Sequence, residues 1–305
     1  MASNAIGTRL GVFGAKRDVG RGRWLFVTPA LIAITGVLGA PIAYALHLSL
    51  EKDILDQPQL HGFNGIHNYT AFLHEGLFWT SIENTLLLSV GAVAVQFVVG
   101  FAIALSLARK NLRGRNTYLS ILLIPMLMPY VAGGLIWLLL LNPTQGIVNY
   151  LLGLVGGPTP AWLASPTLAR LTIIFVDSWH NTAWTVFILL SGLLMLPQES
   201  LDAAAIDGAG KIRTFRHIIL PLMKPVILVA LIIRLIASLM TFDLIYVMTG
   251  GGPGTSTETL SFYIYKLGFK SLNIGEAAAA SIVFLAVVIG LVVLLMRMLP
   301  DPTAA

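Results

Sequence analysis

The chain has 305 residues, of which 56% are hydrophobic and only 11% are charged, and its mean hydropathy is +0.83. Soluble domains average about 25% charged residues, so these values exclude an ordinary water-soluble protein and indicate that lipid covers much of the chain. The absence of cysteine excludes disulfides, thiolate metal sites and a cysteine nucleophile. The net charge of +5 is interpreted first as a topology signal, not as a nucleic-acid surface.

Six long apolar stretches follow one another along the chain. Each is long enough to cross a bilayer as a helix, which takes about 20 residues, and none alternates in polarity as a transmembrane β-strand would. The sequence therefore predicts an all-α integral membrane protein. Pro125 and Pro129 are expected to bend the third span. The predicted spans are 24–48, 82–107, 118–141, 168–196, 218–247 and 277–299.

Lysine and arginine are unevenly distributed over the segments between these spans. Of the 19 basic residues, 14 belong to the N-terminal segment, the loops after the second and fourth spans, and the end of the sixth. The excess of positive charge predicts that both termini and the 197–217 loop are cytoplasmic. The expected layout is a tail at 1–23, a membrane domain at 24–299 and a second tail at 300–305.

The segment after the fourth span has the signals of a short helix. Pro197 ends the span, and acidic residues at 199 and 202 favour the first turn of a new helix. Gly208 and Gly210 then break it. The small residues at 203–205 let another backbone approach closely, so the segment suits a groove on a partner. A plain interfacial connector is the alternative.

Beyond this physical pattern, the loop resembles the EAA loop of bacterial ABC-importer permeases. The similar residues are Asp202-Ala203-Ala204, Gly208 and Ile218-x-Leu220-Pro221, with Asp202 in place of the usual glutamate. Three further segments are similar to carbohydrate-type permeases, the group that contains maltose and glycerol-3-phosphate permeases. They are Gly-Ile-His-Asn-Tyr at 65–69, Asn-Thr-Leu at 84–86, and the segment 242–253, which ends in Thr-Gly-Gly-Gly-Pro.

The resemblance implies a type I importer permease with six transmembrane helices and a coupling helix between the fourth and fifth. Its expected partners are a second permease subunit, two cytoplasmic ATP-binding subunits and an extracytoplasmic solute-binding protein in the bacterial inner membrane. The chain itself has no phosphate-binding loop of the Gly-x-x-x-x-Gly-Lys-Ser/Thr type, so it is not expected to bind and hydrolyse ATP by that route. As a transport subunit it is expected to have no enzymatic activity, cofactor, metal or nucleic-acid partner. The residues implied for ATPase coupling are Asp202, Ala203, Ala204, Asp207 and Gly208.

Two polar groups inside the spans are candidates for the substrate path. In the fourth span, four side chains are spaced i, i+3, i+4 and i+7 and therefore share one helical face. Hydrogen-bonding edges beside an aromatic plane suit a sugar, whereas a polar contact that serves helix packing is the alternative. A second group lies near the end of the fifth span, where Asp243 could equally be a surface residue. The candidates are Asp177, His180, Asn181 and Trp184, and then Phe242, Asp243 and Tyr246.

Arg234 and Asp177 are both expected near the bilayer midplane, where an unpaired charge is costly. Asp243 is nine residues from Arg234, so on one continuous helix the two would lie on nearly opposite faces. The sequence therefore predicts an ion pair between Arg234 and Asp177 that locks the fourth and fifth spans together. The alternatives are that Arg234 binds backbone carbonyls or faces a water-filled cavity.

The predicted function is the permease subunit of an ATP-driven importer for an uncharged carbohydrate. Glycerol-3-phosphate or another charged solute is the alternative within the family, disfavoured because only Arg234 provides a positive charge inside a span. An ion-coupled secondary transporter with Asp177, His180 and Asp243 as a proton relay is the alternative from another class. A membrane scaffold without transport is a third.

Overall fold

The structure is a computed structural model and describes residues 19–57, 59, 61–109 and 112–298, with side chains from Val27 onward. The predicted tail at 1–23 therefore lies largely outside the described residues, and the predicted tail at 300–305 lies wholly outside them. The chain divides into two units, residues 1–47 and 48–305. The first contains α1 (Val19–Ile34), a π-helical turn (Thr35–Gly39) and most of α2 (Ala40–Ser49). No described residue from Val27 to His47 is buried within the chain, as suits a helix surrounded by lipid.

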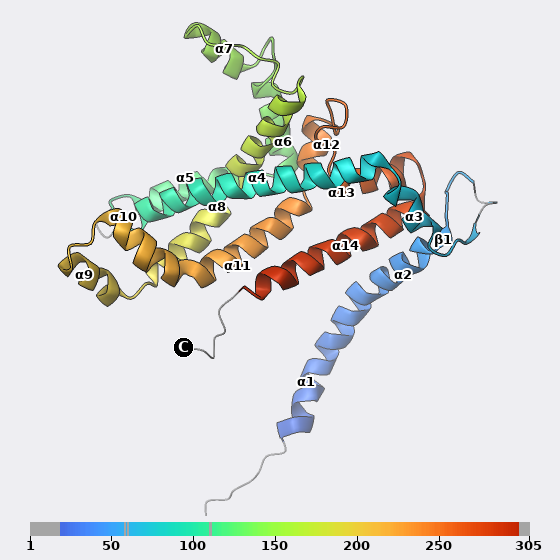
Figure 1. Cartoon of the computed structure of the whole chain (residues 1–305), viewed down its shortest axis with the longest axis horizontal. Coiled ribbons are helices and arrows are strands. Elements are labelled where there is room, and N and C mark those ends of the chain that lie inside the picture. The colour runs from blue at the N-terminus through green and yellow to red at the C-terminus, as the bar shows by residue number, and fades with distance from the viewer. Residues whose placement is uncertain (1–18, 58, 60, 110–111, 299–305) are drawn as a thin grey trace, which may run out of the picture. The chain divides into compact units, whose positions relative to one another are not determined.

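The second unit is almost entirely helical (Figure 1). A small antiparallel pair of strands, β1 (Glu51–Lys52) and β2 (Gly62–Phe63), precedes its helices. Two π-helical turns, Phe215–Ile219 and Lys266–Lys270, interrupt the helical segments. The helices are α3 (His67–Leu73), α4 (Gly76–Leu107), α5 (Arg115–Leu127), α6 (Tyr130–Leu140), α7 (Ile147–Leu154), α8 (Pro166–Leu194), α9 (Gln198–Ile206), α10 (Lys211–Thr214), α11 (Leu220–Leu239), α12 (Asp243–Met248), α13 (Leu260–Tyr265) and α14 (Ile274–Met296).

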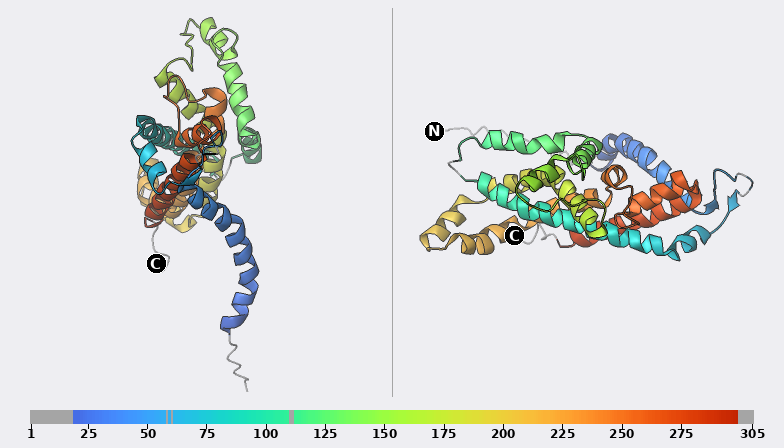
Figure 2. Two further views of the ribbon diagram at one scale, coloured as in Figure 1. Left: turned by 90° about the vertical axis from the view of Figure 1, so that its right-hand side faces the viewer. Right: turned by 90° about the horizontal axis from the view of Figure 1, so that it is seen from above.

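The described residues contain five helical segments long and apolar enough to cross a membrane, or six if the bent pair α5–α6 forms one span. This confirms the predicted all-helical membrane fold. Within the second unit α4, α8, α11 and α14 run lengthwise, and α4 packs along α8 and α11 (Figure 1, Figure 2). Small residues allow close approach between them: Ala92 and Ala104 of α4 are fully buried, and Gly100 lies against Thr185 of α8.

The third span is broken. The axes of α5 and α6 differ by 93°. Met128 is extended, as a residue before proline tends to be. Pro129 caps the start of α6 and has no backbone N–H with which α5 could continue. The predicted bend is confirmed at Pro129, whereas Pro125 is accommodated inside α5.

The predicted fifth span, 218–247, is too long. The helix that crosses the membrane ends with α11 at Leu239, and α12 is a separate helix. The hydropathy of 218–247 suggests one continuous helix, but packing against other parts of the chain accompanies its division into α11 and α12. The absent side chain of Gly134 in α6 leaves room for Leu244 and Met248 of α12, whose atoms lie 3.3 and 3.6 Å from the position of a β-carbon there.

Two segments outside the long helices, one around α3 and one around α13, are ordered by hydrogen bonds. Asn68 donates to the Ser49 and Glu51 carbonyls at 2.9 and 2.7 Å, and so ties α3 to the start of the second unit. Farther along, the Tyr263 hydroxyl donates to Glu75 at 2.8 Å. Burial, together with this hydrogen bond, raises the pKa of Tyr263 well above its usual range.

Asn84 and Arg170 hold the loop that precedes α13. The Asn84 amide donates to the Thr255 and Glu258 carbonyls at 2.8 and 3.1 Å, and its oxygen accepts from Arg170 at 3.0 Å. Arg170 also donates to the Ser256 carbonyl at 2.8 Å. The loop is therefore fixed to α4 and α8.

Replacing Asn84 with leucine should lower the thermal midpoint of the purified protein in detergent. The substitution removes three hydrogen bonds, and each buried polar group left without a partner costs about 1–3 kcal/mol. Glu83→Gln is the matched control, because Glu83 is the exposed neighbour in the same helix turn. Equal midpoints for the two variants would show that the loop does not depend on Asn84.

Candidate functional site

A cavity of about 250 Å³ lies among α6, α8, α11 and α12. It contains members of both predicted polar groups, Asp177 and Asn181 from α8 and Phe242 and Asp243 at the start of α12, together with Arg234. Side chains that are distant in sequence thus meet in one space. The complete lining is Tyr130, Asp177, Asn181, Arg234, Ala237, Met240, Thr241, Phe242 and Asp243.

Asp177 is the centre of a buried hydrogen-bond network. Its carboxylate accepts from the Tyr130 hydroxyl, from Asn181 at 2.9 Å and from Gln96 at 3.1 Å. The other end of the Gln96 amide accepts from Arg234 Nε at 2.9 Å. Asp177 is 3% exposed, Gln96 is fully buried and Arg234 is 5% exposed. One carboxylate therefore connects α4, α6, α8 and, through Gln96, α11.

The predicted direct ion pair between Asp177 and Arg234 is wrong. Among the described residues no ion pair joins the two side chains, because Gln96 lies between them. A glutamine amide has a donor and an acceptor, so it can bind an anion and a cation at once. Gln96 does not stand out among ionisable groups or on the aromatic face of the fourth span, although an uncharged amide inside an apolar span is a visible signal in the sequence.

The separation predicted for Arg234 and Asp243 is also wrong. The two residues would lie on opposite faces only of one continuous helix, but α11 ends at Leu239 and Asp243 begins α12. The break allows both side chains to line the same cavity.

Three of the predicted path residues do not line this cavity. Trp184 and Tyr246 are exposed, at 47% and 50%. His180 is buried beside the break in the third span: its Nε2 lies 3.2 Å from the Met128 carbonyl oxygen, and its ring meets that of Tyr130 edge-on. Of the four residues predicted on this face of α8, Asp177 and Asn181 therefore line the cavity. His180 contacts the break between α5 and α6, and Trp184 is exposed.

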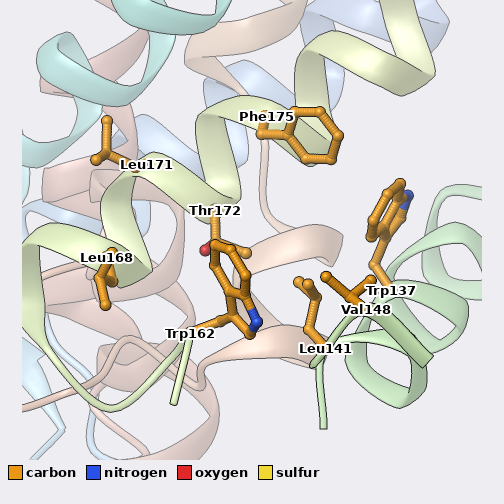
Figure 3. Close-up of a pocket in the computed structure, with 8 residues that line it drawn as sticks. All are labelled: Trp137, Leu141, Val148, Trp162, Leu168, Leu171, Thr172 and Phe175. Atoms are coloured by element: carbon orange, nitrogen blue, oxygen red, sulfur yellow. The ribbon is translucent and has the colours of Figure 1, made fainter. Parts of the chain in front are cut away.

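A second cavity, of about 420 Å³, has a different character (Figure 3). Its wall is formed by α8 side chains and by residues of α6, α7 and the segments that join α6 to α8. Apart from the Thr172 hydroxyl and two indole nitrogens, its lining is apolar, so it offers few partners for a polyhydroxylated solute. The lining residues are Trp137, Leu141, Val148, Trp162, Leu168, Leu171, Thr172 and Phe175.

The predicted helix after the fourth span is confirmed as α9, and Gly208 ends it. The Gly208 N–H donates to the Ala205 carbonyl at 3.2 Å, and the Ala209 N–H donates to the Ala204 carbonyl at 2.9 Å. With φ at +69° for Gly208, these bonds form the Schellman cap. Of the five residues implied for coupling, Ala204 is buried, whereas Asp202, Ala203, Asp207 and Gly208 are exposed.

Comparison with known proteins gives a consistent result. Residues 96–303 match the family described as binding-protein-dependent transport system inner membrane component. The chain is 35% identical over 258 residues to the trehalose/maltose transport system permease protein MalF of Thermococcus litoralis, with 85% of each chain covered. It is 36% identical over 262 residues to the sulfoquinovosyl glycerol transport system permease protein SmoG of Agrobacterium fabrum, covering 86% and 85%.

A solved structure shares the fold. It is a bacterial ABC transporter involved in the import of the acidic polysaccharide alginate, matched with a TM-score of 0.78 at 24% identity over 92% of this chain and 96% of that one.

Replacing Gln96 with leucine should destabilise the chain. It leaves Asp177 and Arg234 without their shared partner, at a cost of about 1–2 kcal/mol in a membrane protein. Thr185→Val is the matched control, because the fully buried Thr185 hydroxyl of α8 has no hydrogen-bond partner among the described residues. Thermal unfolding in detergent should separate the two variants.

The same measurement tests whether the network acts as a unit. Adding Arg234→Met to Gln96→Leu should cost less than the sum of the two single effects, because the first change has already removed the bond. Strict additivity would mean that Gln96 and Arg234 do not stabilise each other.

Proposed function

The chain belongs to the family of binding-protein-dependent transport system inner membrane components, and on this premise we propose that it forms part of the path of an ATP-driven importer for an uncharged sugar. A member of this family is a multi-pass membrane transport subunit and not an enzyme. Relatives named for trehalose and maltose transport support the sugar.

The balance of charge in the cavity is the main observation that favours an uncharged sugar as the substrate. Arg234 is joined to Asp177 through Gln96, so the positive group is matched before any solute enters. Asp243, which is exposed, adds a second negative group. Hydroxyl, amide and carboxylate groups beside the Tyr130 and Phe242 rings suit a solute with many hydroxyls and an apolar ring face.

A charged glycerol derivative is the second candidate. One atom favours it: the Nη2 of Arg234 is buried and has no hydrogen-bond partner among the described residues. Guanidinium groups are frequent partners of phosphate and other anions. Relatives named for sulfoquinovosyl glycerol and sn-glycerol-3-phosphate transport match the chain at 36% and 32% identity.

The proposed importer contains other subunits besides this chain. They are a second permease subunit, two cytoplasmic ATP-binding subunits and an extracytoplasmic solute-binding protein. The exposed face of α9 suits the contact with the ATPase. Ile206 of α9 and Ile212 of α10 are 87% and 83% exposed among charged neighbours, and so give a partner apolar side chains to cover. The transport cycle is alternating access, driven by ATP through α9.

Reconstitution in vesicles tests this function. The complete importer should take up labelled maltose or trehalose only when ATP is available on the α9 side. Uptake by this chain alone, driven by a proton gradient, would instead support a secondary transporter that uses Asp177, His180 and Asp243.

Replacing Gly208 with valine should uncouple transport from ATP hydrolysis. The left-handed conformation of Gly208 costs a residue with a β-carbon roughly 1–2 kcal/mol, so the end of α9 should change shape. Gly210→Val is the matched control, because Gly210 lies two residues away with φ at −66° and open space around it. The rate of ATP-dependent uptake should fall for the first variant only. Coupled transport by Gly208→Val at the control rate would remove α9 from the proposed contact.

A further inference from the structure

A row of aromatic rings extends from the cavity. Phe242, which lines the cavity, stacks on Tyr246 with ring centroids 5.5 Å apart and meets Tyr265 at 5.0 Å. Tyr265 in turn stacks on Phe269 at 5.3 Å. Phe262 lies behind them, 6.0 Å from Phe242 and 5.9 Å from Tyr265. We call these five rings the aromatic row.

The row combines a buried base with open ring surfaces. Phe262 is only 6% exposed, whereas Tyr246 is 50% and Phe269 is 74% exposed. Aromatic side chains contribute most when buried, so a connected set that remains open indicates a surface that another molecule covers.

The row is held by a rigid segment. The Thr259 hydroxyl caps α13 by accepting from the Phe262 N–H at 3.4 Å, and the Leu260 N–H donates to Thr85 of α4 at 2.8 Å. Lys266 forms an ion pair of 3.0 Å with the buried Glu258. Stacking surfaces held in this way lose little side-chain freedom on binding.

The side of the membrane on which the row lies follows from the topology. It begins at Phe242, just after the end of α11, and reaches Phe269, close before α14. Both points lie on the connection between the last two spans, which is the side of the membrane opposite to α9. In the proposed importer, the row therefore lies on the side of the membrane from which the solute-binding protein would deliver solute.

A membrane-interface belt is the simplest alternative explanation for exposed aromatic residues. Belt residues need no contact with one another and no connection to a polar cavity. Here the rings are in mutual contact, and the innermost one shares the cavity wall with Asp243 and Thr241.

We propose that the aromatic row binds a second sugar ring of a disaccharide or longer saccharide, end to end with a first ring in the cavity. This inference rests on the proposed sugar-import function. The cavity of about 250 Å³ is smaller than the pockets of about 300–1,000 Å³ that commonly enclose drug-sized ligands, so a disaccharide in it would extend beyond the cavity. The row supplies apolar ring faces where that second ring would lie.

The test uses the complete reconstituted importer and labelled maltose and trehalose as probes. Tyr246→Leu and Phe269→Leu should each raise the KM for uptake about tenfold, equivalent to about 1.4 kcal/mol of binding, with kcat unchanged. Tyr246→Phe keeps the ring and should retain most of the wild-type affinity. Tyr150→Leu is the matched control, because Tyr150 is 64% exposed on α7, away from the row.

The outcomes distinguish a failure of the aromatic-row inference from a failure of the proposed sugar-import function. If the wild-type importer takes up sugar and Tyr246→Leu behaves like Tyr150→Leu, the aromatic row is a belt and the inference is overturned while the proposed function stands. If the wild-type importer takes up neither disaccharide although ATP hydrolysis is intact, the proposed substrate class fails and the inference fails with it. Phe269→Leu keeps the test valid if Tyr246→Leu misfolds, because the Phe269 side chain is mostly exposed and its loss should not affect folding.

Discussion

A carboxylate buried in the middle of a membrane protein must be surrounded by hydrogen-bond donors, and this constraint organises the second unit around Asp177. Removing a charge from water costs several kcal/mol unless partners replace the lost hydration. Tyr130, Asn181 and Gln96 supply donors, and Gln96 brings Arg234 close enough to balance the charge. Because these partners come from different helices, satisfying one group fixes the positions of α4, α6 and α11 against α8.

The same network places the candidate site between the two parts that must communicate in a coupled transporter. Arg234 belongs to α11, which leads back through α10 to α9. Tyr130 is the first residue after the break that turns α6 away from α5, and His180 contacts the carbonyl of Met128 at that break. Under the proposed function, a movement of α9 would be carried along the chain to Arg234 of α11 in the cavity wall. Hydrogen bonds through Gln96 and Asp177 connect Arg234 to Tyr130 at the break.

Local signals in the sequence predicted the features that depend on near neighbours. The length of the apolar stretches predicted the spans, Pro129 predicted the break between α5 and α6, and Gly208 predicted the end of α9. Features that depend on distant partners were not predictable in this way. Gln96 appears as one polar residue in an apolar run, and only the fold shows that it lies between Asp177 and Arg234. The end of α11 at Leu239 likewise depends on the fit of α12 against Gly134, which no periodicity in 218–247 reports.

The distance across the break tests most directly whether the Asp177 network holds this arrangement. The chain has no cysteine, so two can be introduced for spin labels at the exposed residues Thr117 of α5 and Leu139 of α6. At a rise of 1.5 Å per residue, a bend of 93° puts these positions about 23 Å apart, against about 33 Å for a straight helix. Pulsed electron resonance on the otherwise wild-type chain should give a narrow distribution at the shorter value, and Tyr130→Phe should broaden it toward the longer one. An unchanged narrow distribution in Tyr130→Phe would contradict the claim that Asp177 holds the break.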